Sequence, residues 1–170
     1  MAILDIIKNR YSCRNYLDKP IEEEKLNTIL EAARLAPSAK NLQDWRFVAV
    51  SDPETRKKIA HAANDQMFIA DAAVIIIACS NSQEVMRCGQ HIGPIDISIA
   101  LEHIALQATE LALATCWIGS FYPDKVKKIL EIPEDIMIVD LMAMGYPADK
   151  PPKKNRETIE NIVSKNKWKW

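Results

Sequence analysis

Apolar residues recur with helical spacing in the first quarter of the chain. One face of this repeat, at positions i, i+3, i+4 and i+7, is formed by Leu26, Ile29, Leu30 and Ala33. The acidic run 22–24 precedes this repeat and suits the positive end of a helix dipole. A proline disfavours helical backbone at the residue that precedes the proline. We therefore expect a helix that begins at this acidic run and ends near Ala36, just before Pro37.

Continuous apolar runs rich in β-branched residues predict strands, and the two longest are typical of strands covered on both faces. The expected strands span Arg46–Val50, Ala73–Cys79, Thr115–Ile118 and Ile136–Met144. Before the third strand, apolar residues cover most of the circumference of an expected helix over Ile95–Ala114. Such a helix belongs at the centre of a core or in a subunit interface.

Two shorter helices complete the pattern. Asp52 is an N-cap candidate directly before Pro53, a residue type favoured at the first helical position, and another helix is expected over Asp124–Leu130. Strands separated by helices predict an α+β fold with three layers, in which helices cover both faces of a mixed sheet. The length of 170 residues favours one domain over residues 1–170.

Composition is that of an ordinary folded protein, with 48% hydrophobic and 26% charged residues. The 22 basic and 23 acidic side chains give a formal charge of -1, which provides no overall field for nucleic acid or an anionic membrane. No stretch reaches the ~18 apolar residues of a membrane span, the N-terminus lacks a signal-peptide pattern, and the four cysteines form no C-x-x-C pair. These features favour a cytoplasmic protein without a disulfide framework.

Common nucleotide and hydrolase signatures are missing. The four glycines form neither G-x-G-x-x-G nor G-x-x-x-x-G-K-[ST], and the sequence also lacks G-x-S-x-G and H-E-x-x-H. A bound phosphate would therefore depend on side chains.

Positive charge gathers at both ends of the chain. Residues 8–19 carry four basic and one acidic side chain, and residues 150–170 carry seven basic and two acidic ones. This pattern fits two interpretations. The termini are simply solvated, or the two cationic groups converge on one anion. The C-terminal tail is also too apolar to stay free, so we expect it to pack, for example on a second copy of the chain, through Ile159, Ile162, Val163, Trp168 and Trp170.

Six motifs lie in order along nearly the whole chain. Residues 10–16 form R-x-S-x-R-x-[FY], and residues 36–47 form A-P-S-x-x-N-x-Q-x-W-x-F. Shorter pieces follow at Gln66 with 69–72, at Asp96, at 116–119, and at 144–147 with 154–156. Each piece is weak alone, but together and in register they resemble the FMN-dependent nitroreductase family.

The resemblance implies a homodimer with two FMN molecules, each held between the subunits. Arg10 and Arg156 match residues that bind the FMN phosphate with help from Lys154, and Ser12 contributes a hydroxyl at the ribityl-phosphate end. Arg14 matches the basic residue beside N1 and O2 of the flavin ring, where a cation stabilises the reduced state.

Further matched positions surround the flavin ring. Gln66 corresponds to a residue at the ring edge, and the backbone of Ile118 and Gly119 to the segment near N5, where glycine permits close approach. By the same resemblance the sheet is mostly antiparallel and the tail packs on the partner subunit. The loop that meets the flavin from the other subunit corresponds to Pro37, Ser38, Asn41 and Gln43.

The implied reaction is ping-pong. NADH or NADPH passes hydride to FMN N5, and a small acceptor such as a nitroaromatic, a quinone, another activated alkene or free flavin then takes two electrons. Many family members have a longer insertion that shapes the acceptor pocket where this chain has only residues 80–94. An FMN carrier or sensor without efficient turnover therefore stays open, as does a non-flavin interaction protein that uses the basic tail.

The motif residues also have purely structural interpretations. Arg10 and Arg14, if one turn apart on a helix, would form a solvated face. The polar loop residues suit a turn that binds nothing. Cys88 and His91 lack a second pair of ligands for a metal site.

Overall fold

The computed structural model describes residues 2–170, whose four named strands form one antiparallel sheet in the order β1-β2-β4-β3. The strands are β1 (Trp45–Val50), β2 (Val74–Ser80), β3 (Ala114–Ile118) and β4 (Met137–Gly145). The helices are α1 (Asp5–Asn9), α2 (Glu23–Arg34), the 3-10 turn η1 (Ala39–Asn41), α3 (Pro53–Ala62), α4 (Phe68–Asp71), α5 (Ile92–Glu110), α6 (Pro123–Leu130) and α7 (Ile159–Ile162).

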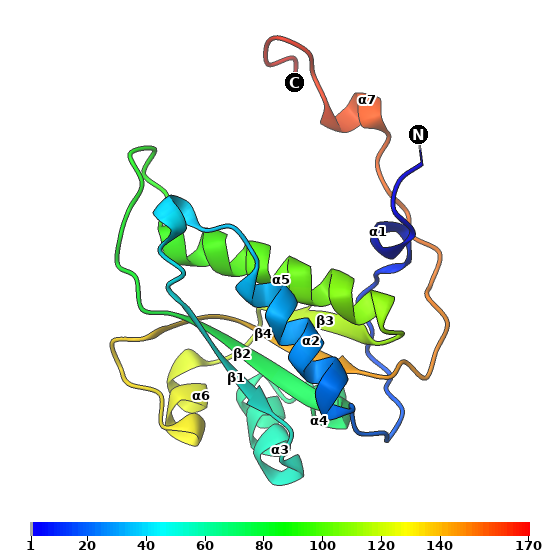
Figure 1. Ribbon diagram of the computed structural model, residues 1–170, viewed down its shortest axis with the longest axis vertical. Helices are drawn as coiled ribbons and strands as arrows, with labels where there is room; N and C mark the ends of the chain where they lie inside the picture. The colour runs from blue at the N-terminus through cyan, green and yellow to red at the C-terminus, as the bar shows by residue number, and fades with distance from the viewer. Residues whose placement is uncertain (1) are drawn as a thin grey trace.

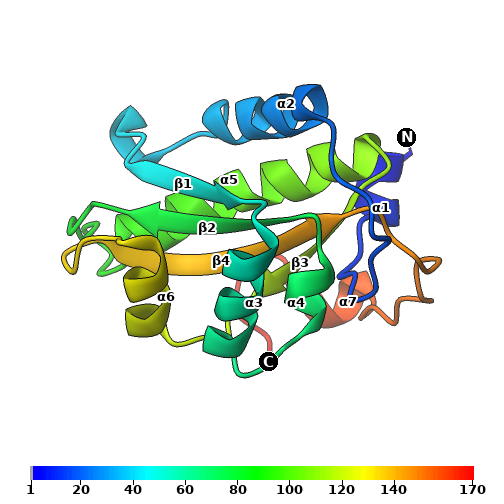
Figure 2. The same ribbon diagram turned by 90° about the horizontal axis from the view of Figure 1, so that it is seen from below.

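Helices cover both faces of the sheet. Helices α2 and α5 lie on one face, and α3, α4 and α6 lie on the other (Figure 2). The segment before α2 adds a parallel bridge between Ser12 and Thr115 at the β3 edge. The predicted three-layer α+β fold with a mixed, mostly antiparallel sheet is therefore confirmed.

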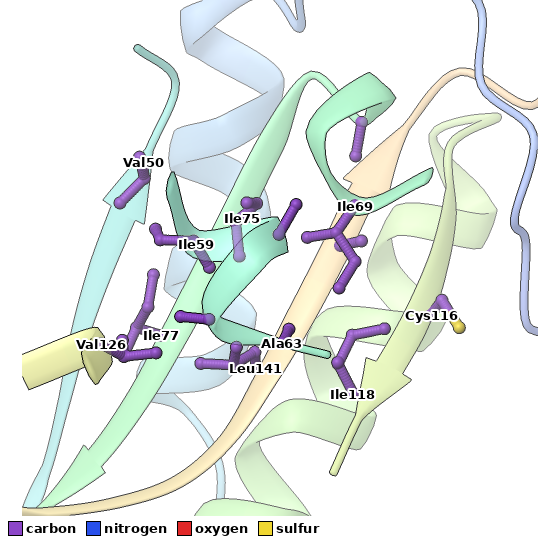
Figure 3. Close-up of a cluster of buried hydrophobic side chains, with 14 of the residues drawn as sticks. Val50, Ile59, Ala63, Ile69, Ile75, Ile77, Cys116, Ile118, Val126 and Leu141 are labelled. Atoms are coloured by element: carbon purple, nitrogen blue, oxygen red, sulfur yellow. The ribbon is translucent and has the colours of Figure 1, made fainter. Parts of the chain in front are cut away.

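Strand β2 separates two hydrophobic cores. Ile75 and Ile77 face the cluster under α3, α4 and α6, which Figure 3 shows, whereas Ile76 and Ala78 face the cluster under α2 and α5. Every residue of β2 is buried. Both faces of the strand are covered, which explains why its sequence is continuously apolar rather than alternating.

The predicted helix boundaries hold where a cap defines them. The carboxylate of Asp52 accepts a hydrogen bond from the Thr55 backbone N–H (2.8 Å), which confirms the predicted start of α3.

The prediction for the central helix, Ile95–Ala114, was wrong at both ends, because α5 spans Ile92–Glu110. Pro94 lies in its first turn, where proline is tolerated. Ala112 takes a left-handed φ of 61° that ends the helix, without any glycine or proline to signal the turn.

The C-terminal tail leads away from the layers. In Figure 1 α7 and the chain end lie apart from the sheet, beyond the N-terminal segment. Trp168 is 78% exposed, and the other apolar side chains of the tail also lie outside both core clusters. The predicted packing of the tail on a partner thus remains a prediction. Within residues 2–170, no helix is long and apolar enough to cross a membrane.

Candidate active site

The N-terminal arginine motif is extended, not helical. Helix α1 ends at Asn9, and the Cys13 backbone N–H then donates to the Thr115 carbonyl (2.9 Å) at the edge of β3. Side chains alternate along extended backbone, so Cys13 is buried while Ser12 and Arg14 are exposed beside it. A shared helical face for Arg10 and Arg14 is therefore wrong, because the chain leaves the helix after Asn9 and pairs with the edge of β3.

The C-terminal part of the chain returns to this segment. The ammonium group of Lys154 donates to the backbone carbonyls of Lys8 and Arg10. Partial burial lowers the pKa of Lys154, and the positive charges of Arg10 and Arg156 lower it further. The two cationic regions predicted from the sequence thus meet at one place.

Two hydrogen bonds to Asp149 also hold the C-terminal segment against the N-terminal one. The Tyr11 hydroxyl donates to the Asp149 carbonyl (2.9 Å), and the Asn15 amide donates to its carboxylate (2.8 Å). Burial raises the pKa of Tyr11 to about 12, so its hydroxyl stays protonated as a donor across the neutral range. Several contacts therefore hold the N-terminal and C-terminal segments together.

The cations gathered here have no acidic partners. Among the ion pairs formed within residues 2–170, none involves Arg10, Arg14, Lys154 or Arg156. The Arg14 guanidinium lies 5.9 Å from the centre of the Phe68 ring, which supports it as a cation–π contact. A concentration of unpaired cations favours binding of an anion with more than one negative charge.

The backbone just beyond the end of β3 is open. A side chain built on Gly119 would meet no atom within 4 Å, so the backbone there faces open space. The Gln66 amide nitrogen donates to the carbonyls of Ala63 (2.7 Å) and Ser120 (3.0 Å). The amide nitrogen of Gln66 thus binds the protein backbone, and only the Oε1 atom is left for a ligand.

The sequence did not single out Asp140, which contacts the same turn. Its Oδ1 atom accepts from the backbone N–H groups of Ile118 (3.2 Å) and Leu141 (2.8 Å). Burial raises the pKa of this partly buried carboxyl, and the two N–H donors act in the opposite direction. A single acidic residue within the apolar run 136–144 was the available signal.

The polar loop of the second motif lies elsewhere. Ser38 Oγ accepts from the Gln43 backbone N–H (3.1 Å), and the buried Asp96 carboxylate accepts from the Ala39 N–H (2.9 Å). Asn41 and Gln43 both have left-handed φ values, 57° and 51°. The loop, with the exposed Pro37 at its start, is therefore held in an unusual conformation by its own Ser38 and by Asp96 near the start of α5.

The loop over residues 37–43 and helix α1 lie at opposite ends of α5, as Figure 1 shows. Asp96 holds the loop near the first turns of the helix, whereas Ile6 of α1 borders a cavity with His103 and Glu110 near its last turns. A helix of this length measures about 28 Å. One chain therefore does not bring all the predicted residues together.

Comparison with known proteins agrees with these features. The family model described as Nitroreductase family matches residues 7–77 and 65–146. The chain belongs to the nitroreductase family.

Similar proteins of the nitroreductase family match most of the chain. A crystal structure of a nitroreductase family protein from Clostridium difficile 630 has a TM-score of 0.88 and 35% identity, covering 99% of this chain and 100% of that one. An FMN-dependent nitroreductase from Clostridium difficile R20291 has a TM-score of 0.84 and 28% identity, covering 96% and 98%. A Bacillus subtilis protein named FMN reductase (NAD(P)H) is 30% identical over 178 residues, which cover 94% of this chain and 72% of the relative.

In this nitroreductase the connection between β2 and α5 is shorter than the sequence predicted. It spans residues 81–91, because β2 extends to Ser80 and α5 begins at Ile92. Val85 bridges to His91 in a small turn, and Lys40 forms an ion pair with Glu84 (3.0 Å). A polar cavity of about 340 Å³ lies between this connection and Gln43.

Proposed function

We propose that this nitroreductase is an FMN-dependent oxidoreductase that takes hydride from NADH or NADPH and reduces a small acceptor. The observation that carries the proposal is the meeting of Arg10, Lys154 and Arg156, from opposite ends of the chain, with no acidic partner among residues 2–170. The similar proteins named for FMN support the choice of cofactor.

The donor set fits FMN. Its dianionic phosphate requires several cationic donors, and the planar guanidinium of an arginine contacts two phosphate oxygens at once. Arg10 and Arg156 would hold the phosphate, with Lys154 beside them and the exposed Ser12 hydroxyl at the ribityl-phosphate end. The Lys154 ammonium also joins the two backbone segments, so it supports the position of Arg10.

The remaining groups would act on the ring. When bound, FMN supplies a ring that accepts hydride from the nicotinamide and passes two electrons to the acceptor. The fixed positive charge of Arg14 would stabilise negative charge at the adjoining edge of the ring. The open backbone at Gly119 permits close approach, and Gln66 Oε1 is available at the ring edge.

A second copy of the chain would complete the site. The loop that carries Ser38, Asn41 and Gln43 lies at the start of α5, whereas α1, which leads to Arg10, lies toward its other end, so the loop would reach the FMN of a partner. The exposed apolar residues of α1 and of the tail, among them Ile7 and Trp168, support a homodimer in which each tail packs on the other subunit. A partner-completed site of this kind gives dimerisation a direct role in cofactor binding.

Steady-state oxidation of NADH and NADPH tests the proposal. Purified FMN-loaded protein should oxidise at least one of them faster when a nitroaromatic, a quinone or free flavin is added, and double-reciprocal plots should be parallel. The short connection over residues 81–91 favours one rival, an FMN carrier or sensor with an uncovered site. That rival predicts yellow protein that oxidises neither cofactor at a useful rate. The cytoplasmic location stays a prediction.

A further inference from the structure

We infer that Asp140 is a positioning residue, which holds the turn Ile118–Ser120 in the conformation that meets the flavin. The inference rests on the proposed function, because the turn is assigned to the flavin only there. It adds a residue from β4 that no motif of the family resemblance includes.

A bulge in β4 directs Asp140 toward this turn. Ala78 of β2 pairs with Asp140 but the next residue, Cys79, pairs with Ile138, so Val139 is an extra residue in β4. Bulges change the direction of side chains beside them. Here the Asp140 carboxylate reaches the Ile118 N–H (3.2 Å), at the last residue of β3, while it also accepts from its neighbour Leu141.

The other side of the turn is fastened from the α3–α4 connection. The Gln66 amide donates to the Ser120 carbonyl (3.0 Å), and the Asn64 amide donates to the Ser120 hydroxyl oxygen (2.8 Å). The Tyr122 N–H donates to the Ala62 carbonyl (2.9 Å) just beyond. Side chains thus hold the residues on both sides of Gly119, while the glycine itself faces open space.

This arrangement is suited to precise placement of backbone. A partly buried carboxylate loses hydration, and burial accordingly raises the pKa of Asp140. Its two backbone N–H donors partly offset that cost. Functional groups act best when neighbouring groups already hold them in the productive geometry, and a displacement of about 1 Å can slow a reaction about 100-fold.

Three variants separate placement of the turn from stability and from charge. Asp140→Ala removes the acceptor, whereas Asp140→Asn keeps an oxygen that accepts the same N–H groups but removes the charge. Asp52→Ala is the matched control, because it also removes a carboxylate that accepts a backbone N–H, at the start of α3. All three would be loaded with FMN, and flavin reduction by the wild type's preferred nicotinamide would be followed by stopped flow without oxygen.

We expect Asp140→Ala to reduce its bound flavin at least about tenfold more slowly than wild type, and Asp140→Asn within about twofold. Asp52→Ala should lower the melting temperature but leave the rate unchanged. Wild-type speed in Asp140→Ala would overturn the inference, as would an Asp140→Asn protein as slow as Asp140→Ala, which would indicate an effect of charge.

A fourth variant covers the case in which Asp140→Ala does not fold. Asn64→Gly removes the amide that holds the Ser120 hydroxyl and suits the left-handed backbone at that position, where φ is 57°. We expect flavin reduction to slow by about threefold or more, as a smaller displacement of the turn. An unchanged rate in this variant would overturn the inference that side chains on both sides of Gly119 hold the turn. A wild-type protein that is yellow but not reduced would instead refute the proposed function.

Discussion

The ammonium group of Lys154 donates a hydrogen bond to the backbone carbonyl of Arg10, and so joins the last part of the chain to the first. The contact explains how two basic regions far apart in sequence come to lie together. The Arg10 side chain has no acidic partner within the described residues 2–170.

Removing either arginine proposed to bind the phosphate should weaken FMN binding. A hydrogen bond to a charged group contributes about 1.5–3 kcal/mol, so Arg10→Ala and Arg156→Ala should each raise the dissociation constant about 10- to 100-fold. Quenching of FMN fluorescence during titration measures this change. Arg87→Ala, which alters an exposed arginine in the 81–91 connection, is the control and should bind FMN as wild type does. Unchanged affinity in both site variants would contradict the assignment.

Arg14 should affect the reduction potential of FMN rather than its binding. Arg14→Ala is expected to keep FMN but to lower its reduction potential, because a positive charge that stabilises the reduced ring has been removed. Arg14→Lys keeps the charge and should fall between the alanine variant and wild type. Spectroelectrochemistry gives the three potentials. A potential in Arg14→Ala equal to that of wild type would remove this role.

Dimerisation should depend on the exposed apolar side of α1. Ile7 is 51% exposed on the single chain, so Ile7→Asp should produce monomers that also lose FMN, because the partner's loop is absent. Sedimentation velocity of the FMN-loaded protein should show twice the mass of one chain for wild type and for the matched control Ile7→Leu. A stable FMN-loaded wild-type monomer would refute the shared site.

Acid should destabilise the fold through Glu22. The Tyr146 hydroxyl donates to this carboxylate (2.5 Å) and lowers the pKa of Glu22 from 4.5 to about 2. A lowered pKa in the folded state stabilises the protein above pH 4.5, and this contribution disappears as the pH falls toward 2. Urea unfolding at several pH values should show a smaller loss over this range in Glu22→Gln than in wild type. Parallel profiles would argue against the hydrogen bond.

The sequence predicted the elements that local chemistry defines. The cap at Asp52 and the continuous apolar run of β2 were recognisable because each depends on residue type at one position or on one short pattern. The end of α5 was missed because Ala112, an ordinary helix former, turns there to let Leu113 enter the core. Tertiary packing decided that boundary.

The site was predictable only as far as its motifs extend. Arg10, Arg14 and Arg156 carry a recognisable pattern of charge, and the structure brings the first and last of them together through Lys154. Asp140 stands out only as the one acidic residue of an apolar run, and its role was not predictable because it depends on the bulge at Val139, a feature of strand pairing. The Ser38 loop is held by a contact distant in sequence, the one from Asp96 to Ala39, and its proposed contact with the FMN of a partner needs a second chain.

The absorbance spectrum of the purified protein, before and after anaerobic addition of NADH and then NADPH, tests the central claim most directly. The account predicts flavin bands that correspond to about one FMN per chain and that bleach when at least one nicotinamide is added. Protein that is colourless and takes up no added FMN would contradict it.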